Sequence, residues 1–364
     1  MFNKTTKMQR TIMAVTAVIA GILMMYIFPT MGMKTLKIAL VEVMERLIPF
    51  DPDFYPAVPI LGATYAIWFV LLWLGGALAI VIAKKVYEGK EWARSTMLGL
   101  AAVPAVAGMT MWIPWMVLVV SDYSKGPVPG IIPPPAWASP AAPVLPVMIF
   151  GLLFYYIFLL MDGDSIKNKI IKIIPYTFLG IVAGMVFMNG QHGVRYFIFI
   201  PELLTANPPG DFNPLGNFFT NLDYYNALAL TTISQAQLDT IKAGVPVDIV
   251  TKSHEIVSQV VKFKEPTYDP NTLTLLLGGF MNYASSYLMV LAIPFLAMKK
   301  KFGYYTVLTT SLATALIGFD GYFVRNSFEW LVGGIMSLAL FIMFLLPIFK
   351  NLFINEDDEE TAEA

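Results

Sequence analysis

The residues best suited to chemistry in this 364-residue sequence fall at the ends of its apolar segments. Asp320, Arg325 and Glu329 lie close together between two apolar runs, and His192 and Arg195 follow a third run. If these ends meet, they form a polar pocket with an aromatic rim, in which His192 could exchange a proton at neutral pH. The candidate residues for a quinone or partner pocket are His192, Arg195, Asp320, Arg325, Glu329, Trp112, Trp115 and Tyr123.

A second interpretation of the same residues is structural. Tryptophan, tyrosine and arginine gather at membrane–water interfaces without binding any ligand, so the set could consist of interfacial anchors and rim salt bridges. No catalytic residue and no metal site is predicted. The chain has no cysteine and two histidines, which excludes cysteine-ligated zinc and iron–sulfur clusters and disfavours a haem held by two histidines in the bilayer.

Composition indicates the class of protein. Hydrophobic residues make up 57% of the chain and charged residues 13%, whereas soluble domains average about 25% charged residues. The apolar residues come in blocks of about 20, the length that crosses the hydrocarbon core as a helix. The sequence therefore predicts an all-α integral membrane protein. About eight transmembrane helices are expected, near 11–30, 59–83, 97–120, 143–161, 173–190, 272–297, 304–319 and 329–349.

Lysine and arginine set the expected orientation. They recur in each connection that would be cytoplasmic if the N-terminus is inside, as at Lys84, Lys169 and Lys299. The positive-inside rule then places both termini in the cytoplasm of a cell, and the chain in its plasma or inner membrane as a multi-pass protein. The net charge of −1 gives no indication of nucleic-acid binding.

The opposite, outer side is expected to carry the larger connections. Residues 33–48 show one apolar helical face, which predicts either a helix lying flat on the outer interface or a helix packed on the protein's own loops. Residues 122–142 are rich in proline and predict an extended loop. The division expected is an N-terminal membrane part at 1–190, an extracytoplasmic cap with two short helices at 191–271, a C-terminal membrane part at 272–350 and an acidic cytoplasmic tail at 351–364.

The middles of the expected spans carry neutral polar residues and almost no charge. A proton-coupled pump usually places a carboxylate or lysine near mid-membrane, so this class is disfavoured. Residues such as Tyr65, Ser286, Tyr287 and Thr314 are expected to form hydrogen bonds between helices instead.

Three functions remain open. The first is a polytopic subunit of a respiratory or redox complex, which anchors an extracytoplasmic partner subunit and binds quinone near the outer face. Such a chain would be a quinone-interacting or non-catalytic subunit rather than a stand-alone enzyme. The stretch "VLLWLGGALAI" is loosely similar to the Gly-Gly-small pattern of the NrfD/PsrC family of eight-span quinol-handling anchors, which hold no cofactors of their own. The long loop and the span before it depart from that family. The alternatives are a transporter or channel for a neutral or apolar solute, and a non-catalytic assembly subunit.

Overall fold

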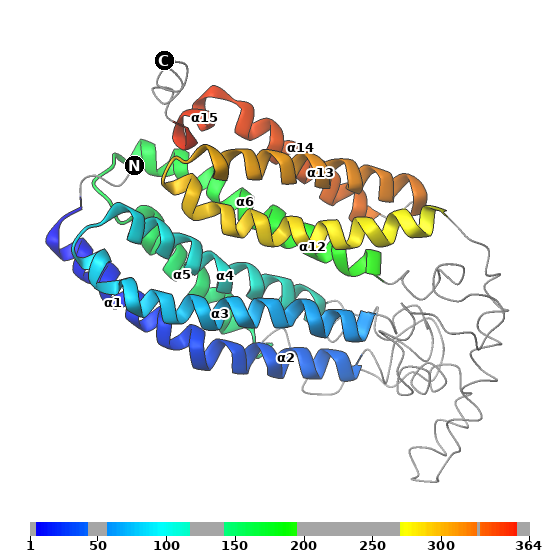
Figure 1. Cartoon of the computed structure of the whole chain (residues 1–364), viewed down its shortest axis with the longest axis horizontal. Helices are drawn as coiled ribbons and strands as arrows, with labels where there is room; N and C mark the ends of the chain where they lie inside the picture. The colour runs from blue at the N-terminus through cyan, green and yellow to red at the C-terminus, as the bar shows by residue number, and fades with distance from the viewer. Residues whose placement is uncertain (1–4, 43–56, 117–141, 195–269, 326–327, 355–364) are drawn as a thin grey trace, which may run out of the picture.

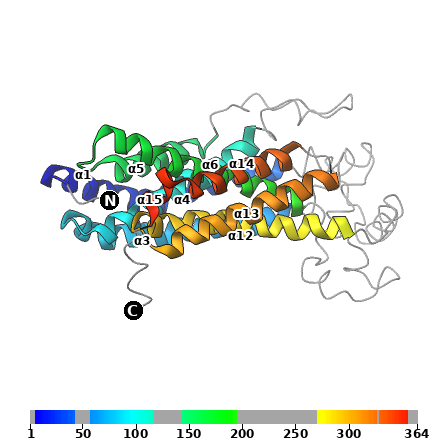
Figure 2. The same ribbon diagram turned by 90° about the horizontal axis from the view of Figure 1, so that it is seen from above.

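In the computed structural model, which describes residues 5–42, 57–116, 142–194, 270–325 and 328–354, every regular element is a helix. The helices run along one common axis as an elongated bundle (Figure 1, Figure 2). The elements are α1 (Lys7–Ile22), η1 (Leu23–Ile27), α2 (Phe28–Glu42), α3 (Ala57–Tyr87), α4 (Glu91–Trp115), α5 (Leu145–Leu160), α6 (Ile166–Val194), α12 (Pro270–Ala297), α13 (Lys301–Arg325), α14 (Phe328–Leu345) and α15 (Pro347–Phe353).

Seven helical segments in the described ranges are long and apolar enough to cross a membrane. An eighth, α5, is equally apolar but spans 16 residues. Large apolar side chains such as Leu74, Val81 and Leu316 are exposed on the outside of the bundle, where lipid would cover them. The prediction of an all-α membrane protein that contacts the bilayer is therefore confirmed.

The first helix is longer than expected. Thr6 and Gln9 form a capping box at its start, and the chain continues through the π-helical segment η1 into α2 without a break. Residues 33–42 therefore do not begin a separate interfacial helix, which corrects that part of the prediction for 33–48; residues 43–48 lie outside the described ranges. The apolar face of α2 packs on α3 and α4, and Leu36 is buried there.

The C-terminal boundary also differs from the prediction. Residues 351–353, expected in the acidic tail, complete the short helix α15. Phe353 is fully buried and stacks on Phe344 of α14 with 4.6 Å between ring centroids. Residues 355–364 of the expected tail, most of the proline-rich loop and residues 195–269 of the expected cap lie outside the described ranges, and residues 191–194 form the last turn of α6.

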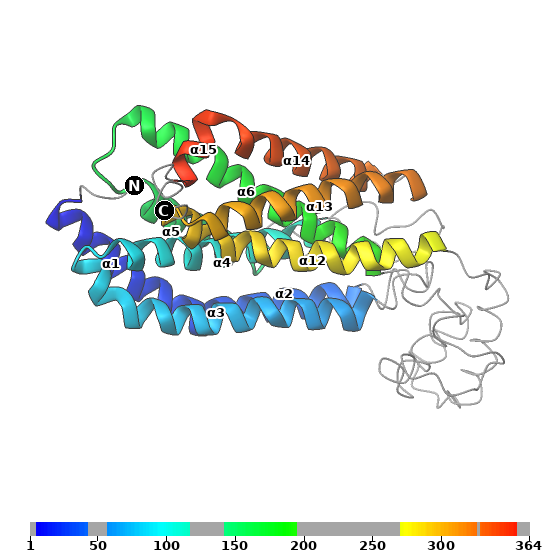
Figure 3. The same ribbon diagram turned by 45° about the horizontal axis from the view of Figure 1, so that its top comes forward.

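The bundle has two groups of helices joined through its centre. α3 packs on α1 and α4, α4 packs on α5, and α12 packs on α6 and α13, while α13 packs on α14. The contact of α12 with α4 joins the groups (Figure 3). Small residues bring the backbones close: a Cβ at Gly151 would fall on the backbone of Ala105, and one at Gly318 on that of Gly334. Such contacts drive helix association in a membrane, where lipid removes most of the hydrophobic driving force.

The two ends of the bundle differ in their connections. We call the end where α1 begins and α15 lies the terminal end, and the other the opposite end (Figure 1). The short connections at 88–90, 161–165 and 298–300 all lie at the terminal end, because each follows a helix that runs toward it. The sequence-predicted site residues that the structure describes all lie toward the opposite end.

Candidate functional site

The predicted site residues occupy four helices. Trp115 is buried and Trp112 is half-buried near the end of α4, and His192 is half-buried in the last turn of α6. Asp320 is exposed on α13, and Glu329 is exposed in the first turn of α14. Arg325 is the last residue of α13, and its side chain is not among those described. Tyr123 and Arg195 lie outside the described ranges.

In the part of the chain that the structure describes, two cavities lie near these residues, and each is formed by different helices. Asp320 lines a cavity between α12, α13 and α14, which we call the Asp320 cavity. Gln191, the neighbour of His192, lines a separate cavity between α2, α3, α4 and α6, which we call the Tyr65–Gln191 cavity. Of the candidate residues, Asp320 lines the first of these cavities, and the second is lined by neighbours of candidates and by none of the candidates themselves.

The Asp320 cavity has a volume of about 220 Å³ and a mostly apolar wall. Its lining residues are Leu277, Gly278, Met281, Ile317, Asp320, Gly321 and Trp330. A dry cavity of about 150 Å³ is enough to hold benzene, so this one has room for a substituted six-membered ring. Asp320 is the charged residue in the lining, and its carboxylate places a hydrogen-bond and proton acceptor beside an apolar space.

Trp330 forms the inner wall of the Asp320 cavity. It is 1% exposed and packs against Ile317, Tyr322 and Val324. A Cβ at Gly321 would fall on the indole ring, so glycine at this position allows Trp330 to lie close against α13. Leu277 and Met281 on α12 are 56% and 48% exposed, so that the cavity borders the outside surface of the bundle, where lipid would lie. An apolar molecule could therefore reach the cavity from the bilayer.

The Tyr65–Gln191 cavity is much smaller, about 20 Å³, which is close to the space of one water molecule. The Tyr65 hydroxyl donates a hydrogen bond to the Thr110 carbonyl at 2.6 Å, and Gln191 Nε2 donates to the Tyr65 oxygen at 2.7 Å. These bonds connect α3, α4 and α6. The arrangement therefore holds helices together and leaves no room for a ring.

The other neutral polar residues confirm the expected role in helix packing. Ser286 donates to the Ala183 carbonyl at 2.7 Å, Tyr287 donates to the Thr64 carbonyl at 2.6 Å, and Thr314 donates to Ser337 at 3.0 Å. Each bond joins two helices, as expected where no water is available. Next to them, Phe187 is the centre of an aromatic core. Its ring contacts are with Tyr65, Trp68, Tyr283 and Tyr287, at centroid distances of 4.8–5.9 Å.

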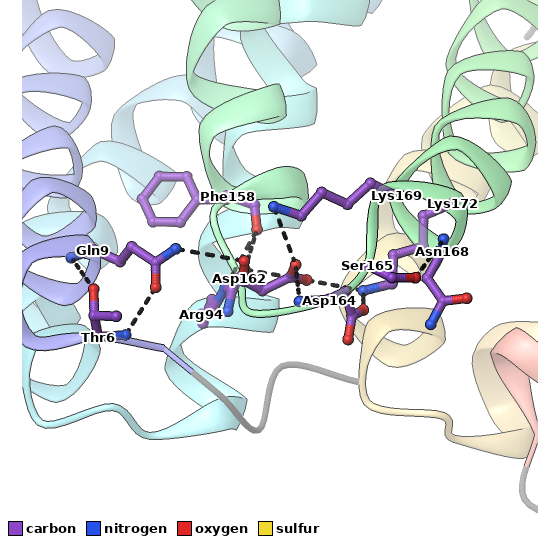
Figure 4. Close-up of polar contacts among 10 residues, drawn as sticks. All are labelled: Thr6, Gln9, Arg94, Phe158, Asp162, Asp164, Ser165, Asn168, Lys169 and Lys172. Atoms are coloured by element: carbon purple, nitrogen blue, oxygen red, sulfur yellow. Dashed lines mark hydrogen bonds and ion pairs between the residues drawn. The ribbon is translucent and has the colours of Figure 1, made fainter.

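A buried ionic cluster lies at the terminal end, and sequence reasoning missed it (Figure 4). Asp162 follows α5, and its side chain is 1% exposed. Lys172 Nζ lies 2.8 Å from one oxygen of the Asp162 carboxylate. A guanidinium nitrogen of Arg94 and Nζ of Lys169 each lie 3.8 Å from an oxygen of the same carboxylate. Lys172 also pairs with Asp164. We call Arg94, Asp162, Asp164, Lys169 and Lys172 the Asp162 cluster.

The Asp162 cluster fixes the junction of several helices. The Arg94 guanidinium donates two hydrogen bonds to the Phe158 carbonyl, at 3.2 and 3.3 Å, and so connects α4 with α5. Gln9 Nε2 of α1 donates to the Asp162 carbonyl at 3.4 Å. The signal available in the sequence was the stretch "MDGDS", in which two carboxylates separate an apolar run from a lysine-rich helix.

Within the described ranges, no group of three histidine, aspartate or glutamate side chains is arranged to hold a metal ion. Comparison with known proteins adds no assignment. No model of a protein family, no curated protein and no solved structure matches the chain.

Proposed function

We propose that the chain is a polytopic membrane subunit of a redox complex and that it binds the head group of a quinone or quinol in the Asp320 cavity. The observation that carries the proposal is the carboxylate of Asp320 in the lining of an apolar cavity large enough for a ring. A quinone site needs an apolar cleft for the ring and a polar group near the ring oxygens. The cavity offers both features, with Trp330 as the aromatic wall.

The chemistry follows from the position of Asp320. Oxidation of a quinol releases two protons and two electrons. The Asp320 carboxylate would accept the proton of one ring hydroxyl and pass it to water, because the residue is also exposed, and would then take and release the proton of the second hydroxyl in the same way. The electrons would go to a redox centre in a partner subunit. The apolar lining would exclude water from the ring, and the tail would leave the cavity past Leu277 and Met281 into lipid.

The partner and the orientation complete the proposal. With the lysine-rich terminal end in the cytoplasm of a plasma or inner membrane, the Asp320 cavity faces the outside. The long segment 195–269 then belongs to the outer side, where it would hold an extracytoplasmic partner subunit. Protons released at Asp320 would thus enter the outer compartment.

The alternatives draw less support from the described residues. A transporter of neutral solutes would need polar side chains along a path, but the Thr310 and Ser311 hydroxyls donate to carbonyls of their own helix, at 2.7 and 2.6 Å. A non-catalytic assembly subunit would have no use for the Asp320 cavity, and it becomes an outcome of the experiment below.

The experiment is quinol oxidation by the complex purified in mild detergent from native membranes. Asp320→Asn keeps the shape of the side chain and removes the proton acceptor. Because a positioned general base contributes at least about a hundredfold, we expect kcat to fall by roughly that factor while the partner still co-purifies. Glu329→Gln is the matched control, because it removes an exposed charge at the same end of the bundle outside the cavity lining. Equal turnover in both variants and the wild type would refute the proposal and leave the assembly role.

A further inference from the structure

A second feature, at the terminal end, is a run of three lysines where the chain turns from α12 into α13. We call Lys299, Lys300 and Lys301 the lysine turn. Lys300 is exposed, and Lys301, the first residue of α13, is half-buried. Lys299 has a left-handed backbone conformation, with a φ of 55°, which lets the chain reverse between the two helices. The reversal places three positive charges close together.

The described carboxylates of the terminal end do not neutralise the lysine turn. Lys300 and Lys301 form no ion pair with any residue that the structure describes. Glu88 pairs with Lys85. The other described carboxylates of this end interact with cations of the Asp162 cluster; they are Glu91, Asp162 and Asp164. Lys300 and Lys301 are therefore available to a negatively charged partner.

The last described residues of the chain lie beside the lysine turn. Lys299 Nζ donates to the Asn351 carbonyl of α15 at 3.5 Å. Phe353 of α15 stacks on Phe344, whose carbonyl accepts a hydrogen bond from the Tyr304 hydroxyl at 3.0 Å. Because Tyr304 is in the first turn of α13, α15 and the start of α13 meet at the end of α14.

The residues that follow are strongly acidic. Residues 355–364, which we call the acidic tail, hold six carboxylate side chains and no lysine or arginine. Ile354, directly before them, is 6% exposed and is therefore held against the bundle. An extended residue covers at most about 3.5 Å, so Glu356 stays within about 7 Å of Ile354 and Glu360 within about 21 Å. The chain thus keeps these carboxylates within reach of the lysine turn.

We propose that the acidic tail docks on the lysine turn, with its carboxylates from Glu356 onward paired with Lys300 and Lys301. Because the tail is joined to the surface that it binds, its effective concentration there is in the millimolar range, and weak exposed pairs are sufficient. Such pairs are screened by salt, so the contact is reversible. The tail would withhold the lysine turn from other anions, such as phospholipid head groups. This inference does not depend on quinone binding at the Asp320 cavity.

Carbodiimide cross-linking of the purified full chain in neutral detergent tests the contact. The reagent joins a carboxylate to an adjacent lysine amine, and mass spectrometry identifies the joined peptides. Lys84 and Lys90 are the matched controls, because they are exposed near another connection of the same end. We expect the acidic tail to be joined to Lys300 or Lys301 at least about fivefold more than to the controls, which corresponds to about 1 kcal/mol.

Salt and charge reversal show whether the contact is electrostatic. Because the chain has no cysteine, spin labels at Thr361→Cys and Phe302→Cys report the distance between the acidic tail and the lysine turn. Phe302 is 65% exposed and directly follows the turn. We expect a population at short distance that falls at least about fivefold when salt rises from about 0.1 M to about 1 M, because the Debye length then shortens from about 10 Å to about 3 Å. Lys300→Glu with Lys301→Glu should remove it as well.

An exchange of charges completes the test. Adding Asp357→Lys and Asp358→Lys to the reversed lysine turn should restore the population at short distance, whereas Lys84→Glu with Lys90→Glu alone should leave it unchanged. The unfolding temperature of each variant shows that it is folded. Cross-links of the acidic tail that are absent, or spread evenly over the turn and the controls, would overturn the proposal. Label distances that respond equally to reversal at the turn and at the controls would also overturn it.

Discussion

The two ends of the bundle use charge in opposite ways. At the terminal end Asp162 is buried among three cations that connect α4, α5 and α6. At the opposite end Asp320 and Glu329 are exposed, and Asp320 borders a cavity. A buried carboxylate with several partners is fixed in place, whereas an exposed carboxylate beside an empty space can accept a proton or a ligand. The comparison indicates that the terminal end holds the fold together, and it agrees with our proposal that the chemistry takes place at the opposite end.

The largest effect on stability is expected at Asp162. Asp162→Asn removes the carboxylate and leaves Lys172 and Arg94 buried without it, which costs about 3 kcal/mol in the free energy of unfolding. Chemical unfolding in mixed micelles, followed by tryptophan fluorescence, measures this. Asp164→Asn is the control, because its side chain is 30% exposed and Lys172 keeps its ion pair with Asp162, so a loss of only about 1 kcal/mol is expected. If both variants lost the same free energy of unfolding, the burial of Asp162 would make no additional contribution to stability.

The next effect tests the wall of the Asp320 cavity. Gly321→Leu places a side chain on the Trp330 ring, and overpacking of this kind costs about 2 kcal/mol in the free energy of unfolding. Gly62→Leu is the control, because a Cβ at Gly62 meets nothing within 4 Å, and its effect should stay within about 0.5 kcal/mol. The same unfolding assay compares them. A neutral Gly321→Leu would mean that Trp330 is free to move and that the cavity has no fixed wall.

The smallest effect on stability is expected at Tyr65, and it separates the roles of the two cavities at the opposite end. Tyr65→Phe removes the hydroxyl that bonds to Thr110 and Gln191, and a single bond between membrane helices is worth about 0.6 kcal/mol. Because the Tyr65–Gln191 cavity has no room for a ring, quinol turnover should stay unchanged. A turnover loss without a loss of stability would move the site to Tyr65 and contradict the assignment to Asp320.

The sequence predicted the helices well because their apolar blocks match the thickness of a membrane. Several helices extend beyond the expected bounds: α13, for example, was expected at 304–319 and extends over Lys301–Arg325. Its polar residues fit into an apolar helix because Thr310 and Ser311 donate to carbonyls one turn earlier. The start of α2 was misjudged because an apolar helical face looks the same whether it packs on lipid or on α3 and α4.

The sites depended on contacts that no local pattern contains. Asp162 meets Arg94 across 68 positions of sequence, and the partners become visible only when α4, α5 and α6 are assembled. Asp320 was identified as a candidate, but Trp330, which lines the same cavity, was not. This pairing arises from Gly278 and Gly321, whose lack of a side chain leaves room for the indole, and a glycine in a sequence does not tell what fills the space beside it.

The most direct test of the Asp320 cavity is to map where a photoreactive quinone attaches to the protein. The complex in native membranes would be labelled with an azidoquinone, and the modified peptides identified by mass spectrometry. We predict that the label falls on residues 277–281, 317–321 or Trp330, and that an excess of unlabelled quinone prevents it. Labelling confined to other parts of the bundle, such as the residues around the Tyr65–Gln191 cavity, would contradict the assignment of the Asp320 cavity.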